Sequence, residues 1–214
     1  MLRTGGLEFE GPAREAACEA PDCDVPLSPP SREEAEAAVR TLIRWAGDDP
    51  AREGLRATPG RVVRAYEEWF AGYRDDPQAL LARTFEEVGG YADMVLLRDI
   101  PVVSFCEHHM APIRGVAHVG YLPRDRVVGI SKLARLVAAY GRRLQIQERL
   151  TASIAGALHA ALNPRGVGVV IRATHDCMAS RGVHTPDVAM VTKRLLGDFN
   201  ADPLRGDFMA ATGL

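Results

Sequence analysis

The segment PVVSFCEHHMAPIRGVAHVGYL, residues 101–122, places a polar cluster between two apolar runs. The flanking runs, 101–105 and 115–122, are rich in valine and aromatic residues, which is typical of β-strands. The cluster at 106–109 contains cysteine, glutamate and two histidines. These side chains bind zinc or move protons, and burying them without partners is costly. The segment therefore predicts a sheet that carries a chemical site between two strand segments.

The surrounding chain predicts an α+β fold. Before the cluster, Ser31 and Glu34 have the spacing of a capping box at the start of a helix that ends near Gly47. Thr58 is expected to cap a second helix, with Pro59 at its first helical position, that runs towards Phe70. Strands are expected at 94–98, 101–105, 115–122, 126–130 and 167–173, and helices at 131–140 and 145–162. This order of elements favours an antiparallel sheet with helices packed on one face.

Length and composition restrict the class of protein. The chain has 214 residues, 47% of them apolar, which suffices for a real core. A formal charge of -2 gives no broad field for nucleic acid or an anionic membrane. The sequence shows neither an apolar run of about 20 residues nor a signal peptide, so a reducing cytoplasmic location is expected. We expect a disordered tail at 1–30, which includes Cys18 and Cys23, then a helical region at 31–90 and a catalytic domain at 91–214.

Three or four residues of the sequence are candidates for a metal site. Cys106 and His109 have the two-residue gap with which a turn brings two ligands onto one metal. In ATHDCMASRG, a continuing strand would put His175 and Cys177 on the same face, about 7 Å apart. Three ligands, Cys106, His109 and Cys177, would leave an open position for catalysis. Adding His175 would close the shell and make the site structural.

Several motifs resemble GTP cyclohydrolase I: SFCEHHMAPIRGVAHVGYLP, GISKLAR, RLQIQERLT and HDCMASRG, in this order and spacing, with REGLRATPGRV upstream. The resemblance covers about residues 31–214. It implies the tunnelling fold, in which subunits join into a toroidal homo-oligomer, a decamer of two pentameric rings, with active sites between subunits. It also implies conversion of GTP and water into formate and 7,8-dihydroneopterin triphosphate. Zinc is the expected cofactor, with the open set Cys106, His109 and Cys177 as its ligands.

The resemblance also assigns roles to other residues. His108 and His175 would transfer protons, which suits histidine near pH 7, and Glu107 would orient a histidine or solvent. Glu148 would accept both donors of the guanine edge, with Gln147 as a helper. The triphosphate would be bound by basic and polar residues near a helix start and from a neighbouring subunit. These are Ser131, Lys132, Arg135, Arg181, Arg61 and Arg64.

The chain departs from the family pattern at two places. VHTPDVAMVTKRLL follows Arg181 where a run of serine and threonine is common, and Ile113 stands where an aromatic residue is common. Two other functions stay open: a structural zinc protein with four protein ligands, and a nucleotide-binding regulator that has lost turnover. The first would not respond to azide in its cobalt form, and the second would bind GTP without releasing formate.

Overall fold

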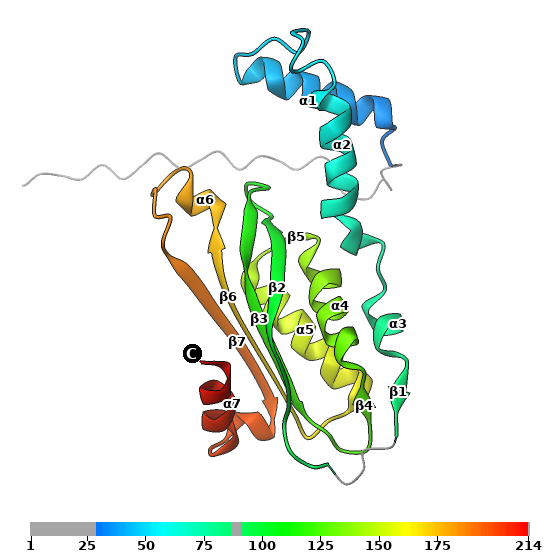
Figure 1. Ribbon diagram of the computed structural model, residues 1–214, viewed down its shortest axis with the longest axis vertical. Coiled ribbons are helices and arrows are strands. Elements are labelled where there is room, and N and C mark those ends of the chain that lie inside the picture. Colours follow the sequence, from blue (N-terminus) through cyan, green and yellow to red (C-terminus); the bar gives the residue numbers. More distant parts are fainter. Residues whose placement is uncertain (1–28, 87–90, 214) are drawn as a thin grey trace, which may run out of the picture.

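The computed structural model describes residues 29–86 and 91–213. The tail expected at 1–30, with Cys18 and Cys23, therefore lies almost entirely outside the described residues. Two layers form the body of the molecule, a long sheet and the helices packed on it (Figure 1). Within the described part, no helix is both long and apolar enough to cross a bilayer.

The main sheet has five strands in the order β5-β2-β3-β6-β7. Its long strands pair antiparallel, whereas the two-residue β5 runs parallel to the end of β2. The α+β prediction is thus confirmed, with a mixed rather than purely antiparallel sheet. The strands are β2 (Val95–Cys106), β3 (Pro112–Leu122), β5 (Leu144–Gln145), β6 (Gly166–His175) and β7 (Ala189–Gly197).

Two strand predictions need adjustment. The runs expected at 94–98 and 101–105 form the single strand β2, whose register shifts between Leu97 and Ile100. Asp99 sits in this irregularity with a left-handed φ of 55°. The run at 126–130 contributes only β4 (Val127–Val128), which pairs with β1 (Thr84–Phe85) before the chain enters a helix.

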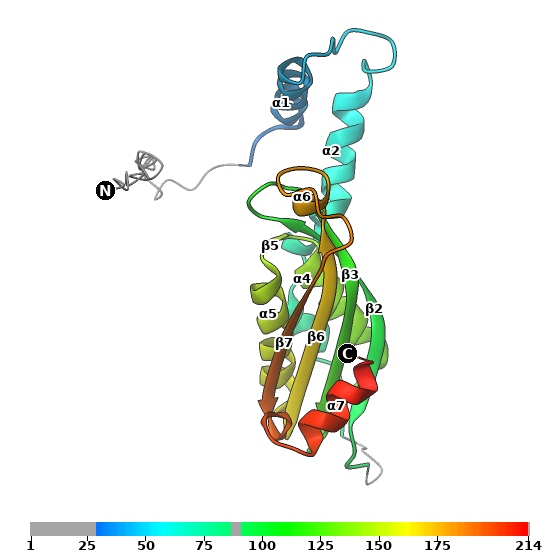
Figure 2. The same ribbon diagram turned by 90° about the vertical axis from the view of Figure 1, so that its left-hand side faces the viewer.

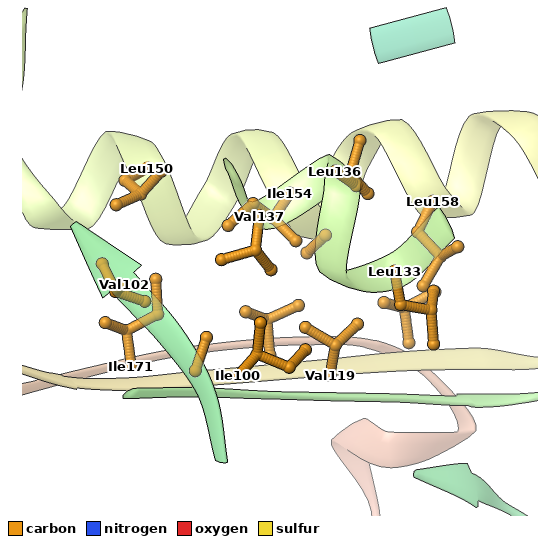
Figure 3. Packing of buried hydrophobic residues seen from close by; sticks show 14 of the residues in the cluster. Ile100, Val102, Val119, Leu133, Leu136, Val137, Leu150, Ile154, Leu158 and Ile171 are labelled. Atoms are coloured by element: carbon orange, nitrogen blue, oxygen red, sulfur yellow. The ribbon is translucent and has the colours of Figure 1, made fainter. Parts of the chain in front are cut away.

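Two helices, α4 (Ile130–Gly141) and α5 (Gln147–Leu162), cover one face of the sheet. Their apolar stripes meet alternate residues of the strands, and this contact is the main core (Figure 3). Full burial of one such aliphatic side chain contributes about 1.5–3 kcal/mol. The facing residues are Leu133, Leu136, Val137, Leu150, Ile154 and Leu158 on the helices, and Ile100, Val102, Val119 and Ile171 on the strands.

The opposite face of the sheet carries α7 (Leu204–Thr212), so helices do not lie on one face alone. Phe208 of this helix is fully buried in a second, smaller cluster with Phe199. Its ring lies over Gly120 and Gly168, which pair with each other across β3 and β6. A Cβ at Gly168 would come within 2.7 Å of the Phe208 ring, so the ring requires a bare backbone there.

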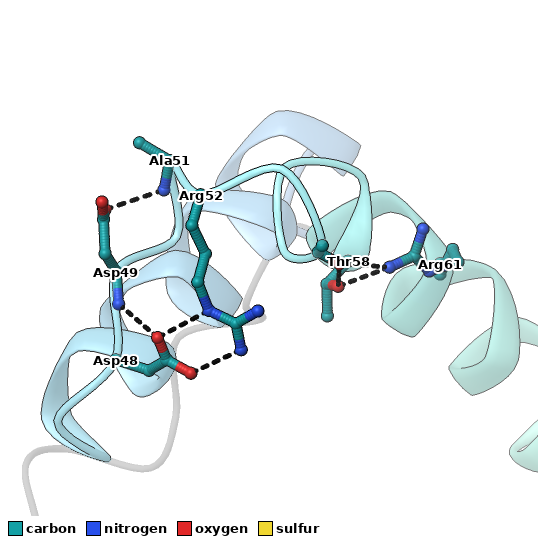
Figure 4. A network of polar contacts seen from close by, with 7 residues as sticks. Asp48, Asp49, Ala51, Arg52, Thr58 and Arg61 are labelled. Atoms are coloured by element: carbon teal, nitrogen blue, oxygen red, sulfur yellow. Dashed lines mark hydrogen bonds and ion pairs between the residues drawn. The ribbon is translucent and has the colours of Figure 1, made fainter.

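The N-terminal helices form a hairpin that extends beyond the sheet (Figures 1 and 2). Ser31 and Glu34 make the predicted capping box of α1 (Arg32–Trp45), and α2 (Thr58–Trp69) begins at Thr58 itself, with Ala57 as its cap. Polar contacts tie the connecting loop together: Arg52 pairs with Asp48, and Arg61 donates to the Thr58 hydroxyl at 2.6 Å (Figure 4). The 3-10 helix Ala71–Tyr73 and α3 (Pro77–Leu81) lead back to the sheet.

Candidate functional site

The polar cluster lies at the end of β2, where the chain makes a tight turn. Cys106 is the buried last residue of the strand, and its N–H donates to the Ala111 carbonyl at 2.8 Å. The turn closes through the Met110 N–H, which donates to the Cys106 carbonyl at 2.7 Å. Met110 itself has a left-handed φ of 53°. His108 and His109 therefore lie within a turn and not on an extended segment.

The second half of the cluster comes from the end of β6. β6 ends at His175, which pairs with Ile113 of β3, and the chain then enters the short helix α6 (Asp176–Ala179). Cys177 lies on this helix, so it is not on a continuing strand beside His175, as the sequence suggested. Because β3 lies between β2 and β6, the sheet brings residues about 70 positions apart into one site.

Three side chains offer the geometry of a metal site. The candidate ligand atoms of Cys106, His109 and Cys177 all lie within 4.8 Å of one another. Cys106 Sγ is 3.8 Å from His109 Nδ1, close to the separation of about 3.6 Å expected between sulfur and nitrogen ligands of a tetrahedral zinc. His175 is not a member of this group. The donor set therefore fits zinc, in the open three-ligand arrangement.

Burial and the neighbouring thiol perturb this cluster. Burial raises the pKa of the Cys177 thiol, and the nearby Cys106 thiol raises it further. Arg181 opposes this shift, and its Nη1 lies 3.0 Å from His109 Nε2. Arg181, which the sequence motif assigned to the triphosphate, thus lies beside the metal cluster.

His108 and Glu107 occupy the solvent side of the turn. His108 Nδ1 lies 3.6 Å from Cys106 Sγ, but its side chain is 64% exposed and is not in the three-ligand group. Glu107 Oε1 lies 4.0 Å from His108 Nε2, while Oε2 accepts from Arg149 at 3.0 Å. Glu107 thus lies between His108 and Arg149, and sequence analysis did not identify Arg149 as its partner.

The side chain of His175 contacts the buried amide of Gln147. Its Nε2 lies 2.9 Å from Oε1 of Gln147, whose side chain is 1% exposed at the start of α5. The same amide contacts Thr192 of β7, and Thr192 contacts Thr151 at 2.6 Å. Burial lowers the pKa of His175, and the carboxylate of Glu148 partly opposes this shift.

A pocket of about 370 Å³ joins these groups. Eight of the residues predicted from sequence line it, and Arg181 is a ninth that contacts His109. The eight are Cys106, Glu107, His108, His109, Gln147, Glu148, His175 and Cys177. Met190 of β7 also lines the pocket, and the sequence analysis missed it because no strand was expected there.

The other predicted substrate residues lie elsewhere in the same chain. Ser131 is at the start of α4, and the end of that helix leads to β5 beside Cys106. At 1.5 Å per residue, Ser131 is roughly 15 Å along the helix from this end. Arg61 belongs to the projecting hairpin, where it binds its own loop. One chain therefore does not bring Ser131, Lys132, Arg135, Arg61 or Arg64 to the pocket wall.

Residues 35–212 match the model of a protein family described as GTP cyclohydrolase I. The chain is 61% identical over 181 residues to "GTP cyclohydrolase 1" of Maricaulis maris, covering 84% of this chain and 88% of that protein. It is 57% identical over 175 residues to "GTP cyclohydrolase 1" of Allorhizobium ampelinum, covering 82% and 87%.

Solved structures give weaker likenesses. An archaeosine synthase QueF-like protein aligns with a TM-score of 0.40 and 22% identity, over 49% of this chain and 93% of that one. A dihydroneopterin aldolase of E. coli aligns with a TM-score of 0.36 and 16% identity, over 48% and 98%.

Proposed function

The chain belongs to the GTP cyclohydrolase I family, and we propose that it is a zinc-dependent enzyme converting GTP and water into formate and 7,8-dihydroneopterin triphosphate. The family has the tunnelling fold that the sequence motifs suggested. The observation that carries the proposal is the group Cys106, His109 and Cys177, which lies in one pocket with His175 and Glu148.

Cys106, His109 and Cys177 would hold the zinc ion. When bound, zinc would act as a Lewis acid that makes water a good nucleophile near neutral pH, as attack on C8 of guanine requires. Both cysteines must remain reduced to serve, which favours the reducing cytoplasm as the location. His175 is not a member of the three-ligand group, and this argues against a closed structural site.

Two histidines would move protons. Both line the pocket, where His108 is exposed and His175 is half-buried. The pKa of His175 lies below its ordinary value, so the ring is neutral at physiological pH and ready to accept a proton. Ring opening and the later sugar rearrangement each need such exchange. Glu107, held by Arg149, would keep His108 in place.

Glu148 would select the base. It is exposed at the start of α5 and lines the pocket, so its carboxylate is available to a ligand. A carboxylate can accept from both N1–H and the exocyclic amine of guanine, whereas adenine offers no such pair. Arg181, which lies beside His109, would bind the triphosphate.

A second copy of the chain would complete the site. Ser131, Lys132, Arg135, Arg61 and Arg64 do not line the pocket of their own chain, so we assign them to the triphosphate site of a neighbouring subunit. An unfilled apolar groove of about 570 Å³ between α1 and α2, and Trp45 at 89% exposure, support assembly. We propose the decamer of two pentameric rings, which light scattering on a size-exclusion column would test by mass.

Turnover is the deciding experiment. The purified, zinc-loaded protein should release formate from GTP and yield a pterin that fluoresces after oxidation. The Glu148→Ala variant serves as the matched control, because it keeps the metal ligands and loses guanine recognition. Binding of GTP with no formate would replace this proposal with a nucleotide-binding regulator.

A further inference from the structure

The orientation of the Gln147 amide follows from its surroundings. Its Nε2 lies 3.1 Å from the carbonyl oxygens of Ile171 and Met190 and 3.1 Å from Thr192 Oγ1. Carbonyl oxygens only accept hydrogen bonds, so the amide atom that faces two of them must be the NH₂ group. The reversed amide would put its oxygen against both carbonyls inside the protein, at the cost of unsatisfied buried groups. Oε1 therefore faces His175.

Two threonines fix the direction of the remaining bonds. The Thr151 hydroxyl donates to the backbone carbonyl of Gln147 at 2.8 Å, and this bond uses the only hydrogen of the hydroxyl. Thr192 must then donate to Thr151 across the 2.6 Å contact, and its lone pair is left to accept from Gln147. Each hydroxyl in this chain of contacts thus has one direction, while the two hydrogens of the Gln147 NH₂ group are shared among three acceptors. This connected buried network restricts the orientation of the amide.

We propose that Gln147 is a positioning residue that holds His175 in the Nε2–H tautomer, so that Nδ1 carries the lone pair that exchanges protons with the substrate. Oε1 of Gln147 can only accept, so the nitrogen 2.9 Å away must bear hydrogen. A proton taken up at Nδ1 makes the imidazolium and is returned from Nδ1 later, while the Nε2–H bond persists. This inference rests on the proposed proton-transfer role of His175, and it makes Gln147 act through that histidine instead of on guanine.

The tautomer of His175 can be determined by NMR, without a measurement of enzyme activity. The full-length protein, labelled with ¹⁵N-histidine, is examined by magic-angle-spinning NMR at pH 8, well above the ordinary histidine pKa of about 6.5. The His175→Asn variant assigns its signals. We expect one species, protonated at Nε2. A ring protonated at Nδ1, or an even mixture, overturns the proposal even if formate is released; the expected tautomer without formate release refutes only the proposed function.

A variant then tests the consequence for turnover. Gln147→Met keeps the side-chain length and removes the acceptor, so both tautomers should appear and kcat should fall about tenfold, part of the roughly 10²- to 10⁴-fold that acid–base groups contribute. Zinc content and the KM for GTP, within about twofold, should be retained, since the guanine acceptor is Glu148. A raised KM with unchanged kcat would instead place Gln147 on the guanine. The control Gln145→Met removes another buried glutamine of the pocket wall and should leave the tautomer unchanged.

Thr192→Val offers a milder perturbation of the same network. One of three contacts of the amide is lost while both carbonyls remain, so kcat should fall only about threefold, as expected for one hydrogen bond. Thr212→Val, which removes a buried threonine hydroxyl far from the site in α7, should leave kcat unchanged. Equal kcat for the two variants would show that Thr192 does not support His175. The wild-type tautomer measurement stands even if Gln147→Met does not fold.

Discussion

Replacing Cys177 by serine removes one of the three candidate zinc ligands while keeping the size of the side chain. Its sulfur lies within 4.8 Å of the ligand atoms of Cys106 and His109. A serine hydroxyl stays protonated at neutral pH and is a poor zinc ligand. His175, the other ring in this part of the pocket, is not a member of the three-ligand group.

The magnitude follows from the number of ligands. Structural zinc sites with four protein ligands have apparent binding free energies of about 10–16 kcal/mol, or roughly 3 kcal/mol for each ligand. Losing one ligand should therefore raise the Kd for zinc about a hundredfold. Formate release should fall with zinc occupancy, since the remaining two ligands hold the ion too weakly.

Competition with a chromogenic chelator measures this Kd directly. The assay uses a parent protein in which Cys18 and Cys23 are serines, so that thiols of the N-terminal segment do not bind metal. Met178→Leu, one position along α6 and 40% exposed, is the matched control and should keep the parent affinity. A Cys177→Ser protein that binds zinc as tightly as its parent would refute the ligand assignment.

Three further predictions separate the roles of other residues. His108→Ala should keep zinc and slow formate release by about 10²- to 10⁴-fold, whereas His109→Ala should lose zinc; the reverse result by metal analysis would exchange their roles. Glu148→Ala should retain zinc but raise the Kd for GTP, measured by calorimetry, because paired guanine donors lose their acceptor. Burial lowers the pKa of His118 below 6.5, so the unfolded chain binds protons first as pH falls. Stability should therefore decline from pH 7 to 5 in guanidinium unfolding, and less steeply in His118→Gln; equal slopes would contradict this reasoning.

Local patterns predicted the elements that have strong periodicity or chemical end signals. Ser31 and Glu34 mark the start of α1, and the apolar stripe of α5 follows its helical spacing. β7 was missed because neither of its faces is consistently apolar, with Lys193 and Arg194 in its middle. Its strand character comes from pairing with β6, which is a tertiary contact that a local pattern does not encode.

Sequence reasoning likewise predicted only part of the candidate site. Residue types alone found the ligand candidates, since cysteine and histidine in tight spacing are few and chemically distinctive. Spacing did not place Cys177, because the chain leaves the strand at His175 and forms a helical turn. Thr151 and Thr192 carry no chemical signal in the sequence, and only the fold brings their hydroxyls to Gln147.

The packing of Phe208 on the sheet couples three positions that are distant in sequence. Whether a substitution is tolerated at one of them depends on the residues at the other two. Gly120 and Gly168 pair across two strands, and any side chain at Gly168 would collide with the ring that covers them. A substitution to alanine there should be harmful alone and tolerated only after the aromatic ring has become smaller. Evolution can therefore change this corner of the protein only in a particular order of steps. The glycines at 120 and 168 leave the space that the Phe208 ring occupies.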